Sequence, residues 1–181
     1  MVENDSCIKH SAIILTAFAL FFMTWYFNLG IRPFENSISN EELIFRGFVF
    51  GELFRTAHWG FLPAAMLTAL AFGSLHFYQG HDLTSALGAF GITAAGSIFF
   101  SWIYVESGNN LWSVIWLHTL MNAPWILFSV SKSGAVGGLW ANGLRLCTLL
   151  IATALVVIYK KRKSLPYHIS KKTLIINRQY A

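Results

Sequence analysis

The sequence has few charged residues for its length. Of its 181 residues, only 12% are charged and 55% are hydrophobic, whereas a soluble globular protein carries about 25% charged residues. The mean hydropathy is accordingly positive, at +0.54. This composition argues against an ordinary soluble domain, because such a domain needs a charged surface.

Cysteine and the familiar hydrolase signatures are also scarce. The two cysteines, Cys7 and Cys147, lie far apart in the chain, so they indicate no disulfide framework, which needs more cysteines at closer spacing. The zinc signature His-Glu-x-x-His is absent, and no Ser/His/Asp set is evident. We also find no internal repeat of the kind that many transporters carry.

The sequence is rich in long uncharged runs. A helix needs about 20 mostly apolar residues to cross the hydrocarbon core of a bilayer. With His counted as neutral, the uncharged runs cover residues 11–30, 59–80, 83–105, 110–131 and 146–159, and the last reaches full length if 139–145 joins it. A further helix, with charges among apolar residues, is predicted at 40–55. The predicted fold is all-α, a polytopic transmembrane bundle of about six membrane helices.

Charge divides the chain into three parts. A polar N-terminal segment, 1–10, precedes the helical domain at 11–159, and a basic tail follows at 160–181. Basic residues beside a span are typical of the cytoplasmic side and can contact anionic lipid. We therefore expect a solvated, cytoplasmic tail next to the lipid bilayer, and no nucleic-acid partner.

Ionisable residues within the membrane are costly, so each is a candidate functional group. The segment 40–55 begins with Glu41 and Glu42, and Arg46 follows Glu42 by one helical turn. At about 100° per residue, Glu42 and Arg46 share a helix face and can form an ion pair. Glu41 points elsewhere and is free of that pair. A set of salt bridges at the membrane surface is the alternative for these charges.

Two uncharged runs also carry polar side chains at one-turn spacing. Phe72 and His76 share a face of the run 59–80, and His118 and Asn122 share a face of the run 110–131. A single His in an apolar helix is more often a packing residue, and a buried Asn can make an ordinary interhelical hydrogen bond. We expect these groups and Glu41 to converge at similar depth in one half of the bilayer.

These motifs, in this order on successive helices, resemble those of a known family. Glu-Glu-x-x-x-Arg, Phe-x-x-x-His and His-x-x-x-Asn are similar to the motifs of the CPBP family, also called the Abi or CAAX-protease family, which includes the type II CAAX prenyl endopeptidases. The match covers roughly 38–125. The resemblance implies that 11–159 is an intramembrane protease domain with its motif core at 38–125.

The resemblance also implies roles for the residues that match. Glu41 would be the general base that activates a water molecule, and His76 would hold and polarise that water. His118 and Asn122 would donate hydrogen bonds to the oxyanion formed at the scissile carbonyl. This division agrees with what amide hydrolysis requires, a base for water and donors for the oxyanion.

The remaining matched residues would support the site. Glu42 and Arg46 would form a pair that fixes the helix carrying Glu41, and Phe72 would shape the cavity beside His76. No cofactor is expected. Zinc held by two His and one Glu is the less favoured alternative.

The expected substrate is a peptide or protein in or at the membrane, cut near its C-terminus or membrane anchor. The expected location is a prokaryotic inner membrane, because the chain is short and prokaryotes carry many members without prenylated substrates. Two other functions stay open: a non-catalytic member acting as a bacteriocin-immunity or scaffold protein, and a transporter or proton channel.

Overall fold

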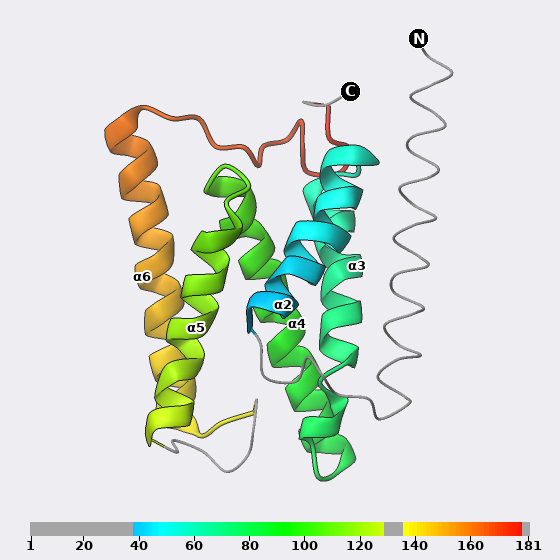
Figure 1. The fold of residues 1–181 in the computed structure, drawn as a ribbon, viewed down its shortest axis with the longest axis vertical. Helices are drawn as coiled ribbons and strands as arrows, with labels where there is room; N and C mark the ends of the chain where they lie inside the picture. Colours follow the sequence, from blue (N-terminus) through cyan, green and yellow to red (C-terminus); the bar gives the residue numbers. More distant parts are fainter. Residues whose placement is uncertain (1–37, 129–135, 179–181) are drawn as a thin grey trace.

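The structure is a computed structural model, which describes residues 38–128 and 136–178. Within these residues it contains helices, turns and one isolated bridge, between Trp59 and Ile176, and no strand. The elements in order are α2 (Ile38–Glu42), η1 (Leu43–Phe50), η2 (Glu52–Thr56), α3 (Phe61–Ser74), η3 (Phe77–Gln79), α4 (Leu83–Glu106), α5 (Leu111–Phe128) and α6 (Leu139–Lys163). Figure 1 shows them as a bundle of roughly upright helices. The all-α prediction is confirmed for the described part of the chain.

The number of membrane helices is established only in part. Two described helices, α4 and α6, are long and apolar enough to cross a membrane, and α3 is a shorter apolar helix. The predicted helix at 11–30 lies outside the described residues. The structure therefore supports a helical membrane bundle without fixing its spans at six.

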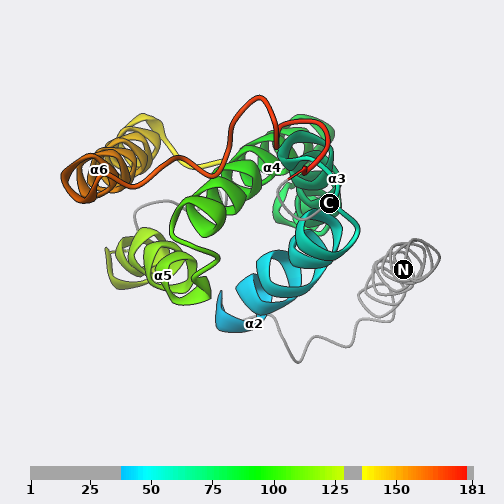
Figure 2. The ribbon, with the colours of Figure 1, turned by 90° about the horizontal axis from the view of Figure 1, so that it is seen from above.

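The exposed surface of helix α6 indicates whether the bundle is suited to lipid or to water. Its apolar side chains are largely exposed, and only Ala141 and Lys160 are buried within it. Figure 2 shows α6 at the edge of the bundle, beside α4 and α5. A helix that is apolar yet exposed over this length suits lipid better than water.

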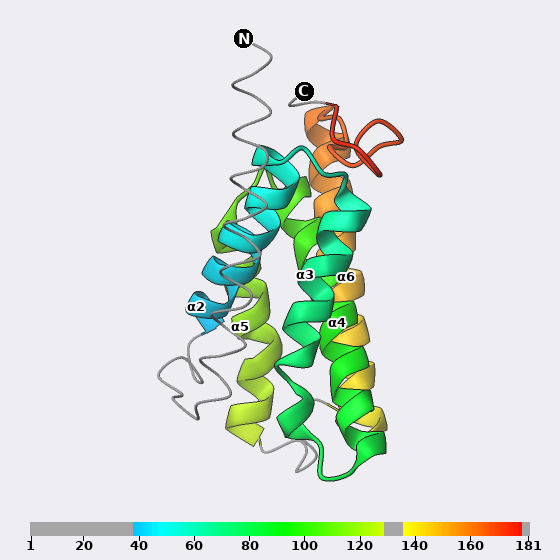
Figure 3. The same cartoon turned by 90° about the vertical axis from the view of Figure 1, so that its right-hand side faces the viewer.

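Helix α4 organises the other elements. It packs against α3, α5, α6 and η1, and Figure 3 shows α3 and α4 running side by side. They are in close contact at Gly73, where an added Cβ would lie 2.9 Å from the Phe90 ring and 3.0 Å from the Phe90 carbonyl oxygen. The absence of a side chain at Gly73 therefore sets the C-terminal end of α3 directly against α4.

The predicted helix at 40–55 differs from expectation in its geometry. Only α2 is α-helical, and η1 and η2 are π-helical, so the Gly51 amide donates to the Arg46 carbonyl five residues earlier. The prediction of a regular 100° step is wrong here, because a π-helix turns less per residue than an α-helix. Such segments are rare and occur frequently at functional sites.

The basic tail also differs from expectation. Residues 164–178, here called the strap, leave α6 and cross the end of the bundle to reach the start of α3 (Figures 1 and 2). Lys160, Thr173 and Asn177 are buried. A wholly solvated tail is therefore wrong, because the backbone and selected side chains of the strap bond to the bundle.

Candidate active site

A buried carboxylate joins two of the three predicted motifs. Glu42 Oε1 accepts a hydrogen bond from Arg46 Nη1 at 3.1 Å and lies 2.6 Å from His118 Nδ1 on α5. Glu42 and Arg46 are fully buried, and His118 is nearly so. Residues far apart in the sequence thus form one continuous polar cluster inside an apolar bundle.

Two aromatic rings enclose the Arg46 guanidinium. Its Cζ lies 4.7 Å from the Phe72 ring centroid and 5.2 Å from that of Phe100. Among the described residues, Arg46 Nε and Nη2 and Glu42 Oε2 have no hydrogen-bond partner. Cation–π contact therefore supplies part of the stabilisation that hydrogen bonds do not give this buried cation.

His76 lies just beyond the end of α3 rather than inside a continuous helix. Its backbone amide bonds the Gly73 carbonyl, three residues earlier, instead of the Phe72 carbonyl. The side-chain Nδ1 instead forms a hydrogen bond with the Phe72 carbonyl oxygen, at 2.7 Å. Since a carbonyl only accepts, Nδ1 carries the proton, and in the neutral ring Nε2 keeps its lone pair.

The ring of His118 is held from two sides. Its Nδ1–H donates to Glu42, and the Phe100 ring lies 5.0 Å away, centroid to centroid. Glu42 Oε1 thus accepts from both Arg46 and His118. The free ring nitrogen, Nε2, is an acceptor in the neutral ring and a donor in the imidazolium.

Glu41 lies beside this cluster without sharing the Glu42 contacts. It is partly buried, and its carboxylate interacts electrostatically with His118, Glu42 and Arg46. His76 likewise interacts with His118 and Arg46. The structure thus brings the Glu41 and His76 segments to the same polar centre.

Asn122 follows His118 by one turn on α5 and is partly buried. Its position near the cluster follows from this spacing, which places the two side chains on one helix face. Both residues lie in the middle of α5, which runs from Leu111 to Phe128 (Figure 1).

Sequence reasoning missed two features of this centre. Phe100 contacts both Arg46 and His118, yet nothing distinguishes it from the other apolar residues of α4. The bond between Glu42 and His118 was also not foreseen, because the spacing on one helix indicates only the Arg46 partner. Both features arise from packing between helices, which a single sequence does not record.

A metal site needs several ligating side chains close together. Within 38–128 and 136–178, no group of three His, Cys, Asp or Glu side chains is arranged to hold a metal ion. In the zinc alternative, His118 and His76 could each offer only Nε2, since their Nδ1 atoms are engaged with Glu42 and the Phe72 carbonyl.

These features define a helical membrane protein with a buried site of Glu, Arg and His. Residues 19–124, more than half of the chain, match the family described as type II CAAX prenyl endopeptidase Rce1-like. The chain belongs to this family, which implies an intramembrane peptidase of the CAAX type. Neither the curated proteins nor the solved structures gave a match.

Proposed function

We propose that this protein is an intramembrane endopeptidase that hydrolyses a peptide bond with water activated by Glu41. The observation that carries the proposal is the 2.6 Å contact between His118 Nδ1 and Glu42. It joins the first and third motifs across 76 residues of sequence and fixes the orientation of an imidazole whose other nitrogen remains available. The substrate would be a membrane-anchored peptide or protein, cut near its C-terminus or its anchor.

The first half of the reaction needs a base and a positioned water. The Glu41 carboxylate would take a proton from water as the water oxygen bonds to the scissile carbonyl carbon. His76 would accept the second hydrogen bond of that water at Nε2, because its Nδ1–H is committed to the Phe72 carbonyl. This division gives the water one strong base and one orienting acceptor.

The oxyanion that forms at the scissile carbonyl needs hydrogen-bond donors. His118 can donate from Nε2 while keeping its Nδ1–H bond to Glu42 only as an imidazolium. Glu42 would stabilise that cation. Arg46 would offset the second negative charge that arises because Glu41 and Glu42 are both carboxylates. In this scheme the carboxylates of Glu41 and Glu42 are balanced by Arg46 and the His118 imidazolium. The Asn122 amide would be the second donor.

Collapse of the tetrahedral intermediate completes the reaction. The carbon–nitrogen bond breaks, and Glu41 returns the proton it took to the leaving amine. The products are a carboxylic acid and a free amine, and water is the sole co-reactant. In this scheme Glu42 and Arg46 are positioning residues, because they act through His118 and the helix that carries Glu41.

The test is cleavage by purified, detergent-solubilised protein, with the wild type beside Glu41→Gln. The substrates are membrane-anchored peptides with C-terminal signals, prenylated and unprenylated, each with and without a strong chelator. Glu52→Gln is the matched control, since Glu52 lies on the same segment in η2 and is partly exposed. We expect cleavage by the wild type and the control, none by Glu41→Gln, and no effect of the chelator.

Each other outcome points elsewhere. Cleavage that the chelator removes would favour a zinc enzyme. Full activity of Glu41→Gln with an inactive, folded Glu42→Gln would mean that the two glutamates exchange roles. Absence of cleavage of any substrate by a well-folded wild type would contradict the proposal and favour a non-catalytic member.

A further inference from the structure

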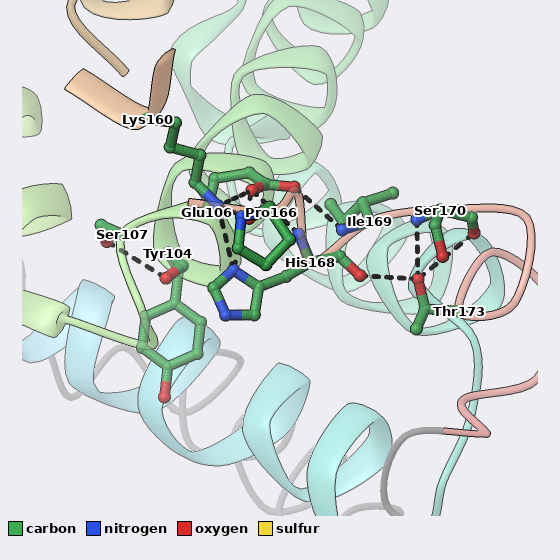
Figure 4. Close-up of polar contacts among 9 residues, drawn as sticks. All are labelled: Tyr104, Glu106, Ser107, Lys160, Pro166, His168, Ile169, Ser170 and Thr173. Atoms are coloured by element: carbon green, nitrogen blue, oxygen red, sulfur yellow. Dashed lines mark hydrogen bonds and ion pairs between the residues drawn. The ribbon is translucent and has the colours of Figure 1, made fainter. Parts of the chain in front are cut away.

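The strap is fastened to the bundle by a buried ion pair at the ends of two helices. Lys160 Nζ, near the end of α6, lies 2.5 Å from Glu106 Oε2, in the last residue of α4. Glu106 also accepts the backbone amides of His168 at 3.2 Å and Ile169 at 2.9 Å. Figure 4 shows Lys160 bonded to the Pro166 carbonyl oxygen and to His168 as well.

The strap then caps the start of α3 through its backbone. The amides of Gly60, Phe61 and Leu62 donate to strap carbonyls, at 2.9, 2.8 and 2.8 Å. The next residue, Pro63, has no amide to satisfy. The strap therefore meets the hydrogen-bonding needs of the first turn of α3. Asn177 adds a bond from Nδ2 to the Phe54 carbonyl in η2.

This fastening places the strap at the membrane–water boundary. Among the described helices, the two that are long and apolar enough to cross a membrane, α4 and α6, end where the strap lies. The ends of spanning helices lie near the polar headgroups. The strap runs across these ends rather than away from them (Figure 2), so its backbone follows the plane of the interface.

The exposed surface of this end is basic and apolar together. Glu106, the carboxylate that fastens the strap, is buried and paired, and 160–178 contains no acidic residue. The exposed basic side chains are Lys161, Arg162, Lys163, Lys171, Lys172 and Arg178. The exposed apolar side chains are Leu165, Tyr167, Leu174, Ile175 and Ile176.

We propose that the strap is an interfacial element that binds an anionic bilayer surface. The lysines and arginines of the strap and of the adjoining end of α6 would contact lipid phosphates, while the apolar side chains of the strap enter the boundary between headgroups and acyl chains. Basic residues near an anionic surface and apolar residues at that boundary both favour binding. Because the strap is bonded to α3, α4 and η2, the lipid contact would stabilise this end of the bundle. The proposal does not depend on the proposed function.

The test is hydrogen exchange of the full chain in nanodiscs, followed by mass spectrometry. One lipid is neutral phosphatidylcholine, and the other has about one third of it replaced by phosphatidylglycerol. We expect exchange in the strap to slow at least about fivefold in the anionic lipid, the effect of a single basic residue near such a surface. Exchange in the middle of α4 should stay unchanged, and high salt should remove the difference.

Two matched variants separate charge from structure. Replacing Lys161, Lys163, Lys171 and Lys172 together by Gln should reduce the difference between the lipids, because only Arg162 and Arg178 then remain as exposed basic side chains, and replacing the four lysines by Arg should keep it in full. All four are exposed and lie outside the bonds that fasten the strap. Ile175→Ser with Ile176→Ser should speed strap exchange in both lipids, because it weakens the apolar contribution.

The proposal is wrong if wild-type strap exchange is equal in the two lipids, or if the Gln variant keeps the full wild-type difference. The same exchange measurement on solubilised protein distinguishes a bilayer surface from other ligands. Equal protection by inorganic phosphate or soluble glycerol phosphate would show a phosphate site instead of a bilayer surface. Equal protection by a short DNA duplex would show a nucleic-acid surface. Either result would overturn the assignment.

Discussion

Replacing Glu42 by Ala should destabilise the protein far more than replacing its neighbour Glu41. Glu42 is fully buried and accepts from both Arg46 and His118. Removing one partner of a buried pair costs about 3–5 kcal/mol, because the other charge stays buried without compensation. The rings that face Arg46 each contribute about 0.5–2 kcal/mol and remain in the variant. We therefore expect Glu42→Ala to lower the free energy of unfolding by about 3 kcal/mol, near the lower end of that range.

The assay is unfolding in mixed micelles, followed by the fluorescence of the seven tryptophans. Glu41→Ala, at a partly exposed position, should cost about 1 kcal/mol or less. The double variant Glu42→Ala with Arg46→Met removes both charges and should recover part of the loss, because no guanidinium then lies buried and unpaired. If Glu42→Ala unfolds like the wild type, or if the two substitutions simply add, the buried pair does not hold the site.

Three further predictions test other parts of the structure. Asn122→Ala should lower kcat by about 10²–10³ if its amide is an oxyanion donor; unchanged KM and stability in the same preparation would separate this from misfolding. Phe100→Ala should cost about 3–5 kcal/mol in the same unfolding assay and reduce cleavage, whereas Phe100→Leu should retain more of both; a Phe100→Ala protein that is fully stable would contradict the role of this ring between Arg46 and His118. Gly60→Ala should release the strap and speed its proteolysis, because the new Cβ would lie 2.1 Å from the Ile175 carbonyl carbon. Gly91→Ala is its control, since no atom of residues 38–128 or 136–178 lies within 4 Å of that added Cβ, and equal proteolysis of the two variants would show that the strap does not need Gly60.

The sequence predicted the features that depend on the residues of a single helix. The uncharged runs predicted α3, α4, α5 and α6 because membrane helices need long apolar segments, and the spacing of Glu42 and Arg46 predicted a pair on one face. Such features depend on local spacing, and a chain carries that information directly.

Features that depend on packing between helices could not be predicted. The π-helical turns at 43–56 look like ordinary helix in a hydrophobic pattern, since no residue type marks them. The burial of Lys160 was missed because a lysine in a run of basic residues normally faces water, and only the opposing Glu106 makes burial favourable. Phe100 shows the same limit, because its role depends on which side chains face it.

The main-chain capping of α3 has a consequence for the order of assembly. The strap follows in the chain every element that it joins, so during synthesis α3, η2 and the Glu106 carboxylate are all made before their partners emerge from the ribosome. Until then, the leading amides of α3 must be solvated at the membrane surface. Closing this end of the bundle is therefore a late event in maturation, and it depends on translation continuing past Asn177.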